Sequence, residues 1–180
     1  MKFTLVTVAP ILSALASGLA LPDLTPRGAP IRPAIAIVIK EDFPNTPFPP
    51  TNSAEVSGNN GVHNVRTLIK IIVPACNGMC TINFSDASTA TGSRRLQLFT
   101  INGYPANGNT WNSKPFTDIH KGTFITSNTG GGPATVLEGF GLTFPCPIST
   151  TTYQFELQPD WDDDSITWDT AVGGLVITCG

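Results

Sequence analysis

From residue 63 to the C-terminus, short runs in which apolar and polar residues alternate are separated by turn-forming residues. The alternation is clearest at residues 153–158, where Tyr, Phe and Leu occupy the odd positions and Gln and Glu the even ones. Successive side chains of a strand point to opposite faces of a sheet, so this pattern predicts a half-buried strand of an antiparallel sheet. Eight runs are predicted as strands in this way: residues 64–74, 80–85, 94–101, 121–127, 134–144, 151–158, 165–170 and 174–179.

The segments between these runs are rich in Gly, Pro, Asn and Asp, the residues that turn geometry favours. No segment shows a sustained apolar period of about 3.6 residues with helix caps. Short strands without helices are typical of two sheets packed face to face. The sequence therefore predicts an all-β fold, an antiparallel β-sandwich of about seven to eight strands stapled by disulfides.

The first 20 residues have the order of a secretory signal peptide: Lys2, an apolar run, and then small residues. We expect cleavage after Ala20, with Ala16 as the alternative position. A retained membrane anchor is disfavoured because Pro10 and Ser13 interrupt a span that is already short for crossing a bilayer. The mature protein is therefore expected to be secreted and extracellular, with no membrane association after cleavage.

Residues 21–62 contain a proline every few positions from Pro22 to Pro50. Proline fixes φ and lacks an amide donor, so most of this stretch is predicted to be a linker or an arm. The exception is residues 34–40, whose β-branched alternation either adds one edge strand or packs as an extended segment across the surface. Since 180 residues with 41% hydrophobic composition supply one core, a single β-sandwich domain is expected at residues 63–180.

Charge and cysteine content narrow the functional classes further. The net charge is −3 and the ten basic residues are scattered, which does not favour nucleic-acid binding. Four cysteines in a secreted chain indicate two disulfides rather than zinc ligands, because three residues separate Cys76 from Cys80 and no histidine lies near them. Asn83 lies in an Asn-Phe-Ser sequon, so we expect it to carry a glycan.

A family resemblance covers residues 66–180. It depends on the order of five stretches: VPACNGMCTINFSDAS, RRLQLFTING, TWNSKP, GTF and GLTFPCPISTTTYQFEL. In this order the chain resembles the But-two C-terminal domain found in many secreted fungal proteins. The resemblance implies a fungal, secreted, β-rich domain, and it brings no catalytic motif that maps onto this chain. The family name indicates binding to an activating enzyme for a ubiquitin-like modifier, an intracellular partner that a secreted chain does not meet.

The same resemblance implies how the cysteines pair. Cys80 begins one predicted strand and Cys146 precedes another, as in the family, so these two are expected to form one bridge. Cys76 and Cys179 then form an added pair that joins the first strand to the last. A bridge between Cys76 and Cys80, closing a tight loop, is the alternative.

Two carboxylates, Glu138 and Glu156, are the candidates for a hydrolytic site. A glycosidase needs only two such groups, held about 5 to 10 Å apart. The simpler interpretation is that both lie on the polar, solvated face of half-buried strands. His63 and His120 are the only histidines, and Asp118 near His120 is interpreted as a surface pair rather than part of a catalytic triad.

The asparagine-rich loop of residues 103–116 is the predicted binding surface. Tyr104, Trp111 and Phe116 offer flat apolar faces, and Asn112 offers amide groups beside them, a combination that suits a sugar ring. Alternatively, these aromatic residues fold back and cap the core.

The acidic stretch around Trp161 offers the carboxylates of Asp160, Asp162, Asp163 and Asp164 in five residues. Calcium takes roughly six to eight oxygen ligands, so a calcium site is one hypothesis and a solvated turn is the other. An EF-hand is excluded because its spacing and distal Glu are absent.

Together these features favour a noncatalytic extracellular domain that binds a glycan, a cell wall or a host surface. The alternative is a small secreted hydrolase that uses carboxylates on a sheet face.

Overall fold

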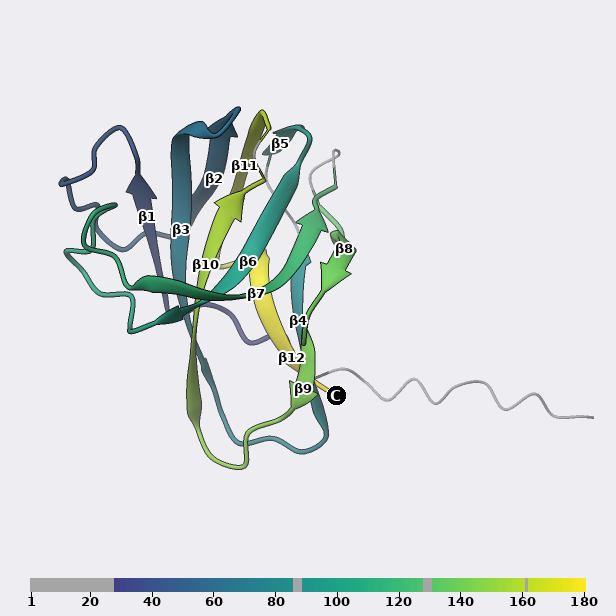
Figure 1. Ribbon diagram of the computed structural model, residues 1–180. Coiled ribbons are helices and arrows are strands. Elements are labelled where there is room, and N and C mark those ends of the chain that lie inside the picture. Colours follow the sequence, from purple (N-terminus) through teal and green to yellow (C-terminus); the bar gives the residue numbers. More distant parts are fainter. Residues whose placement is uncertain (1–27, 86–88, 128–130, 161) are drawn as a thin grey trace, which may run out of the picture.

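The computed structural model describes residues 28–85, 89–127, 131–160 and 162–180, so the predicted signal peptide and Trp161 lie outside the described residues. The chain forms an antiparallel β-sandwich, as predicted, from a nine-stranded and a three-stranded sheet (Figure 1). The large sheet has the order β5-β11-β2-β3-β10-β6-β7-β8 with β1 paired to β3, and the small sheet has the order β12-β4-β9. The strands are β1 (Ile35–Lys40), β2 (Ser53–Asn59), β3 (Val62–Val73), β4 (Met79–Ser85), β5 (Thr89–Gly92), β6 (Arg95–Asn102), β7 (Phe116–Ile125), β8 (Thr135–Gly139), β9 (Thr143–Pro145), β10 (Thr151–Pro159), β11 (Asp164–Asp169) and β12 (Gly174–Cys179).

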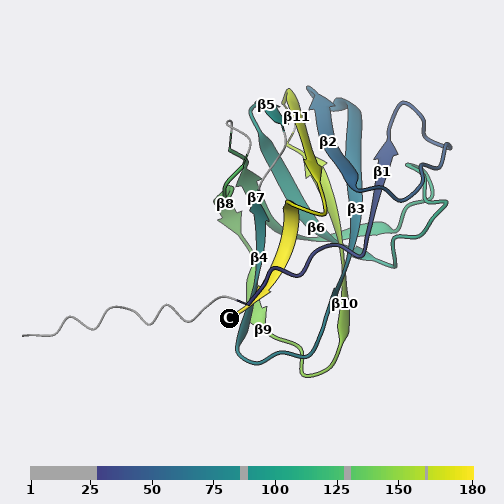
Figure 2. The same cartoon turned by 180° about the vertical axis from the view of Figure 1, so that it is seen from behind.

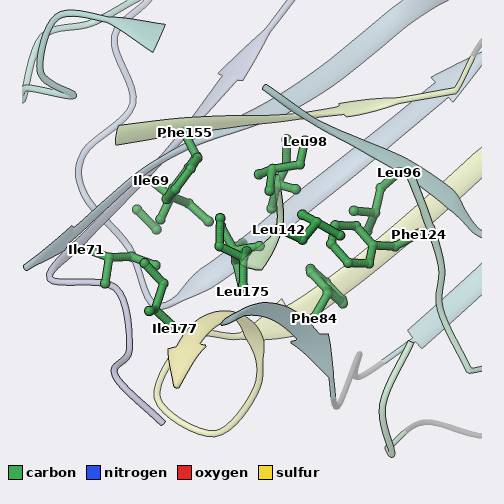
Figure 3. Close-up of a cluster of buried hydrophobic side chains, with 14 of the residues drawn as sticks. Ile69, Ile71, Phe84, Leu96, Leu98, Phe124, Leu142, Phe155, Leu175 and Ile177 are labelled. Carbon is green, nitrogen blue, oxygen red and sulfur yellow. The ribbon is translucent and has the colours of Figure 1, made fainter. Parts of the chain in front are cut away.

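The main hydrophobic core lies between the two sheets. Leu98 and Phe155 point inward from the large sheet, and Phe84 and Leu175 face them from the small sheet (Figure 3). Figure 2 shows β12 and β4 in front of the large sheet. Full burial of each such side chain contributes about 1.5 to 3 kcal/mol, so this inner layer supplies most of the driving force for folding. On β10, the inward positions are the apolar ones, as the alternation of residues 153–158 predicts.

A second, smaller core lies on the other side of the large sheet. Ile37 and Ile39 of β1 pack there with Leu68 and Ile101, and Trp111 packs against them. The segment of residues 103–115, between β6 and β7, lies beside the segment that follows β1 (Figure 1). The large sheet therefore buries apolar side chains on both faces over part of its area.

The proline-rich segment belongs to the sandwich to a greater extent than the sequence suggested. β1 pairs with β3 from Ile35 to Lys40, so this stretch is a strand rather than an extended surface segment. β2, which the alternation analysis did not include, pairs with both β3 and β11 and contributes core residues. The backbone also pairs at Ile31 and Ile177. The sandwich thus begins well before residue 63, because the prolines lie between the paired stretches and leave the ladders intact.

The described residues form twelve strands, more than the seven to eight that the sequence predicted. The predicted run at residues 134–144 is divided into β8 and β9 by Gly141, whose φ of +88° suits glycine. β2 and β5 are rich in small and polar residues, with two and one apolar residues respectively, so they lack the longer apolar alternation that marks the other strands. None of the described residues forms a helix long and apolar enough to cross a membrane.

Two disulfides join the strands of the small sheet and the segments at their ends. Cys80 is bonded to Cys146 and Cys76 to Cys179, the pairing that the resemblance implied, and not Cys76 to Cys80. The loops that they close span 66 and 103 residues in sequence, so each bridge contributes on the order of 4 to 5 kcal/mol by restricting the unfolded chain. The bridges touch, because the Sγ atom of Cys80 lies 3.6 Å from that of Cys76 and 3.8 Å from that of Cys179.

Candidate binding face

We call the side of β10, β6, β7 and β8 that points away from the main core the outer face. Strand register places its side chains in rows that run across the sheet. One row holds Glu156 of β10, Phe99 of β6 and His120 of β7. These residues are separated by up to 57 positions in the chain, so the row exists only through strand pairing.

A second row crosses the same strands and reaches β8. It consists of polar side chains in register: Gln158, Gln97, Thr123 and Glu138. Aromatic rings and hydrogen-bonding groups therefore lie side by side on one sheet surface.

The loop of residues 103–115 covers the Glu156 end of the first row. Glu156 has no solvent exposure, and Arg66 donates from Nη1 to its Oε1 atom at 3.0 Å. Lys114 of the loop donates from Nζ to Oε2 at 2.7 Å, and the hydroxyl of Thr117 donates to the same oxygen. A buried carboxylate needs such compensation, because desolvation strongly disfavours an unpaired charge. Glu156 is thus an internal ion-pair centre and not part of a solvated polar face.

Trp111 anchors this loop. Its ring packs against the second core, and the guanidinium carbon of Arg66 lies 4.5 Å from the ring centroid. Asn112 binds the segment after β1, with its amide N–H donating to the carbonyl of Pro44 and its side chain donating to Asn45 at 3.0 Å each. Trp111 therefore follows the alternative interpretation of the loop, in which its aromatic residues fold back onto a core.

The other two aromatic residues predicted for binding are exposed. Tyr104 is 65% exposed and Phe116 is 77% exposed. With Trp111 turned toward the second core, Tyr104, Asn112 and Phe116 remain as the exposed members of the predicted set.

Beyond the loop, the outer face is open. Phe99 and His120 stack with ring centroids 4.8 Å apart, and the ring of Phe140 lies 5.3 Å from that of His120. Phe140 is 55% exposed. We call the surface of Phe99, His120, Phe140 and Glu138 the open half of the outer face.

Polar contacts continue from the rings toward the edge strand. Nε2 of His120 lies 3.3 Å from the hydroxyl of Thr123, which donates to Oε2 of Glu138 at 3.1 Å. Glu138 is exposed and lies on β8, at the edge of the sheet. This chain of contacts orients the imidazole, and among the described residues Thr123 is the hydrogen-bond partner of the Glu138 carboxylate.

The candidate catalytic groups do not converge on one reaction site. Glu138 faces solvent, whereas Glu156 is fully buried and paired with two cations, so a substrate cannot reach both. The exposed His63 pairs with Asp42 at 2.9 Å. The structure places Thr123, and not Asp118, against Nε2 of His120.

The four aspartates of the acidic stretch have separate partners. Asp160 accepts from Gln97 at 3.1 Å and lies 3.6 Å from Arg95, and Asp163 accepts from Asn60 at 3.2 Å. The hydroxyl of Ser93 lies 3.0 Å from Asp162 and 2.8 Å from Asp164.

Asp164 is the buried member of this stretch, with 4% exposure. Its Oδ1 atom accepts from Ser93 and from the amide of Arg95, whereas Oδ2 has no hydrogen-bond partner among the described residues. Burial raises the pKa of Asp164, and the nearby charge of Asp162 adds to this, although hydrogen bonds from Ser93 and from the backbone of Arg94 and Arg95 act in the opposite direction.

Metal-ligating side chains gather elsewhere. Within the described ranges, the group of three or more with ligand atoms close together consists of the four cysteines, whose sulfurs lie within 4.8 Å of one another. All four are engaged in disulfides. The aspartates do not form a comparable group.

The sequon residue Asn83 lies inside β4, paired with Val176, and not in a loop after a strand. Its side-chain amide makes two long contacts of 3.4 Å, to the carbonyl of Thr81 and the hydroxyl of Thr178. Glycosylation at this position stays a prediction.

Sequence reasoning singled out Glu138 but missed Phe99 and Phe140, the aromatic residues that lie with it in the open half. Alternation within residues 94–101 already places Gln97 and Phe99 on one side of a strand, but it does not show which strand lies beside it. Phe140 was included in a strand run, whereas the structure places it between β8 and β9.

No protein-family model matches this chain, and no curated protein is significantly similar to it.

Proposed function

We propose that this protein is a secreted, noncatalytic domain that binds polysaccharide through the open half of its outer face. The observation that carries the proposal is the register of the large sheet, which sets the rings of Phe99 and His120 beside the row of Gln97 and Glu138. Sugar rings present apolar faces bordered by hydroxyl groups, so they suit a surface where aromatic rings adjoin amide and carboxylate groups.

The shape of the surface favours an extended ligand. The open half lies on a sheet face and continues through exposed Phe140 toward the edge strand β8, which a long chain can follow across several strands. Secretion is the expected context, since a signal-peptide pattern precedes a domain with two disulfides, which persist in oxidising compartments.

The alternative, a hydrolase, has less support. A glycosidase needs two carboxyl groups that reach the same bond. Glu138 is accessible, but Glu156 is enclosed by Arg66, Lys114 and the loop. Catalysis would require that cluster to open and release a paired, buried charge.

A retention assay on insoluble polysaccharides of different chemistry, such as chitin, β-glucan, cellulose and mannan, tests the proposal. Phe140→Ala removes an exposed ring from the open half, and we expect it to weaken binding by about fivefold, the worth of one ring contact. Phe116→Ala removes a still more exposed ring from the end of the loop and is the matched control, for which we expect unchanged retention.

Each contrary result has a clear meaning. Retention that depends on Phe116 and Tyr104, and not on Phe140, would move the site to the loop. Absence of retention on every polysaccharide would refute polysaccharide binding. Release of soluble sugar that is abolished by Glu138→Gln would establish the hydrolase instead.

A further inference from the structure

A cleft opens between the two sheets, on the opposite side of the large sheet from the outer face. Its volume is about 260 Å³. The residues that line it are Ile82, Thr100, Lys121, Gly141, Phe144, Tyr153 and Phe155. Four of these seven are large apolar or aromatic residues, and one carries a positive charge.

The cleft exists because the small sheet is narrower than the large one. β9, at the edge of the small sheet, has only three residues and pairs with β4 over Met79–Thr81. Inner-face residues of β10 and β6 near that edge, such as Tyr153 and Thr100, are therefore only half-buried. Closing the gap would need another strand beside β9, which the described chain does not supply.

Aromatic rings form one wall of the cleft. The ring centroids of Phe144 and Tyr153 are 5.2 Å apart, and those of Tyr153 and Phe155 are 6.5 Å apart with an angle of 6° between their planes. Such a wall offers flat apolar contact to another planar group.

Lys121 supplies the charge. Gly141, with φ of +88°, lies directly beneath its ammonium, since a Cβ atom at Gly141 would be 3.1 Å from Nζ. Within the described part of the chain, no carboxylate forms an ion pair with Lys121. The Tyr153 hydroxyl likewise has no hydrogen-bond partner among the described residues, and burial raises its pKa, so it stays a neutral donor.

We propose that this cleft binds a small aromatic carboxylate, with its ring against Phe144 and Tyr153 and its carboxylate on the ammonium of Lys121. The positive charge selects an anion, and the apolar wall selects a planar, apolar body. The volume lies below the usual range of about 300 to 1,000 Å³ for drug-sized ligands, so a single ring fits best. This site is independent of the outer face.

Titration of the isotope-labelled protein with cinnamate, followed by NMR, tests the proposal directly. We expect saturable one-to-one binding, with the largest amide shifts at Lys121, Gly141 and Phe144. Cinnamamide has the same shape without the charge, and we expect it to bind at least about tenfold more weakly, the worth of one charge-assisted hydrogen bond.

Matched variants separate the cleft from general charge effects. Lys121→Met keeps the apolar stem and should weaken cinnamate binding by about tenfold or more. Lys70→Met removes a half-buried lysine from β3 and should leave binding unchanged. Shifts in the wild-type protein that fail to saturate, that map outside the cleft, or that are equal for cinnamate and cinnamamide would overturn the proposal.

The two proposals can fail separately. Retention on polysaccharide should be the same for Lys121→Met and the wild-type protein, because Lys121 points into the cleft and not onto the outer face. Cinnamate binding that is lost in Phe140→Ala but kept in Lys121→Met would also refute the cleft as its site.

Discussion

The two halves of the outer face begin from the same strand pattern and end with opposite roles. In the covered half, the loop of residues 103–115 buries Glu156 completely and supplies Lys114 to pair with it. In the open half, Glu138 is exposed and accepts one hydrogen bond from Thr123. Alternation alone treats the two carboxylates as equivalent, whereas in the structure β8 is exposed along its whole length and β10 is largely covered.

The difference shows that the loop decides which part of the sheet is available for a ligand. Trp111 and Lys114 of the loop contact Arg66 and Glu156 respectively. The carboxylate of Glu156 is therefore paired within the protein. Phe99, His120 and Phe140 form ring contacts with one another and retain accessible surface, so they are the groups that a ligand can still contact.

Removing the charge of each carboxylate should give the largest difference between the two halves in the free energy of unfolding. Glu156→Gln leaves Arg66 and Lys114 partly buried without their counter-charge, and breaking a buried ion pair in this way costs roughly 3 kcal/mol. Glu138→Gln is the control on an exposed strand and should change stability by less than about 0.5 kcal/mol. Urea unfolding at neutral pH measures both. Equal, small effects would mean that the Glu156 cluster does not hold the loop.

Truncating one aromatic ring in each half should give the next largest difference in the free energy of unfolding. Trp111→Ala removes a half-buried ring from the second core and its contact with Arg66, so we expect a loss of about 2 kcal/mol in the free energy of unfolding. Phe140→Ala should leave stability nearly unchanged.

Polysaccharide retention should respond to these two variants in the opposite order. Measured well below the unfolding temperature, Trp111→Ala should be retained like the wild-type protein. Loss of retention in Trp111→Ala without loss of stability would restore Trp111 as the binding ring.

Much of the fold could be predicted from the sequence because the relevant signals are local. Period-two alternation located the strands around residues 64–74, 94–101 and 151–158, since each of these packs one apolar face on the main core. The cysteine pairing was not a local signal and was implied by the family resemblance. β2 was missed because only two apolar residues, Ala54 and Val56, mark its inward face, which is too short a pattern to stand out.

The candidate site could not be predicted, because it depends on strand register and on the loop of residues 103–115, which covers part of the outer face. Alternation places Glu156 opposite Phe155, but it does not show that a loop from residues 103–115 covers that side. The contact between Phe99 and His120 also depends on irregular pairing, since the register of β6 with β7 shifts on both sides of Phe99. Such a shift has no sequence signature in this chain.

Asp164 is a second buried carboxylate, and unlike Glu156 it has no ion-pair partner among the described residues. We expect its effect on stability to be smaller. Its raised pKa means that the folded state binds a proton more readily than the unfolded state. The stabilisation from this proton is therefore complete below the unfolded pKa of about 3.9 and is lost as pH rises through the folded pKa.

Asp164→Asn should remove this pH dependence, since Asn keeps an oxygen that can accept from Ser93 and from the amide of Arg95. Unfolding midpoints of wild-type and variant protein, measured from acid to neutral pH, give the comparison. Relative to the variant, the wild-type protein should lose stability as pH rises. A wild-type protein that gains stability over this range would show that Asp164 is better satisfied than its geometry indicates.

The smallest expected effect is that of calcium on the acidic stretch. Calcium needs roughly six to eight oxygens at about 2.3 to 2.6 Å, so several carboxylates would have to turn toward one point. Instead, Asp160 is directed to Gln97 and Arg95, and Asp163 to Asn60. We therefore expect calcium and a chelator to give thermal midpoints that agree within about 1 °C, because a ligand stabilises the fold only when its concentration exceeds its dissociation constant. A rise of several degrees in calcium that is absent in Asp164→Asn would show that the unpartnered Oδ2 atom of Asp164 belongs to a metal site.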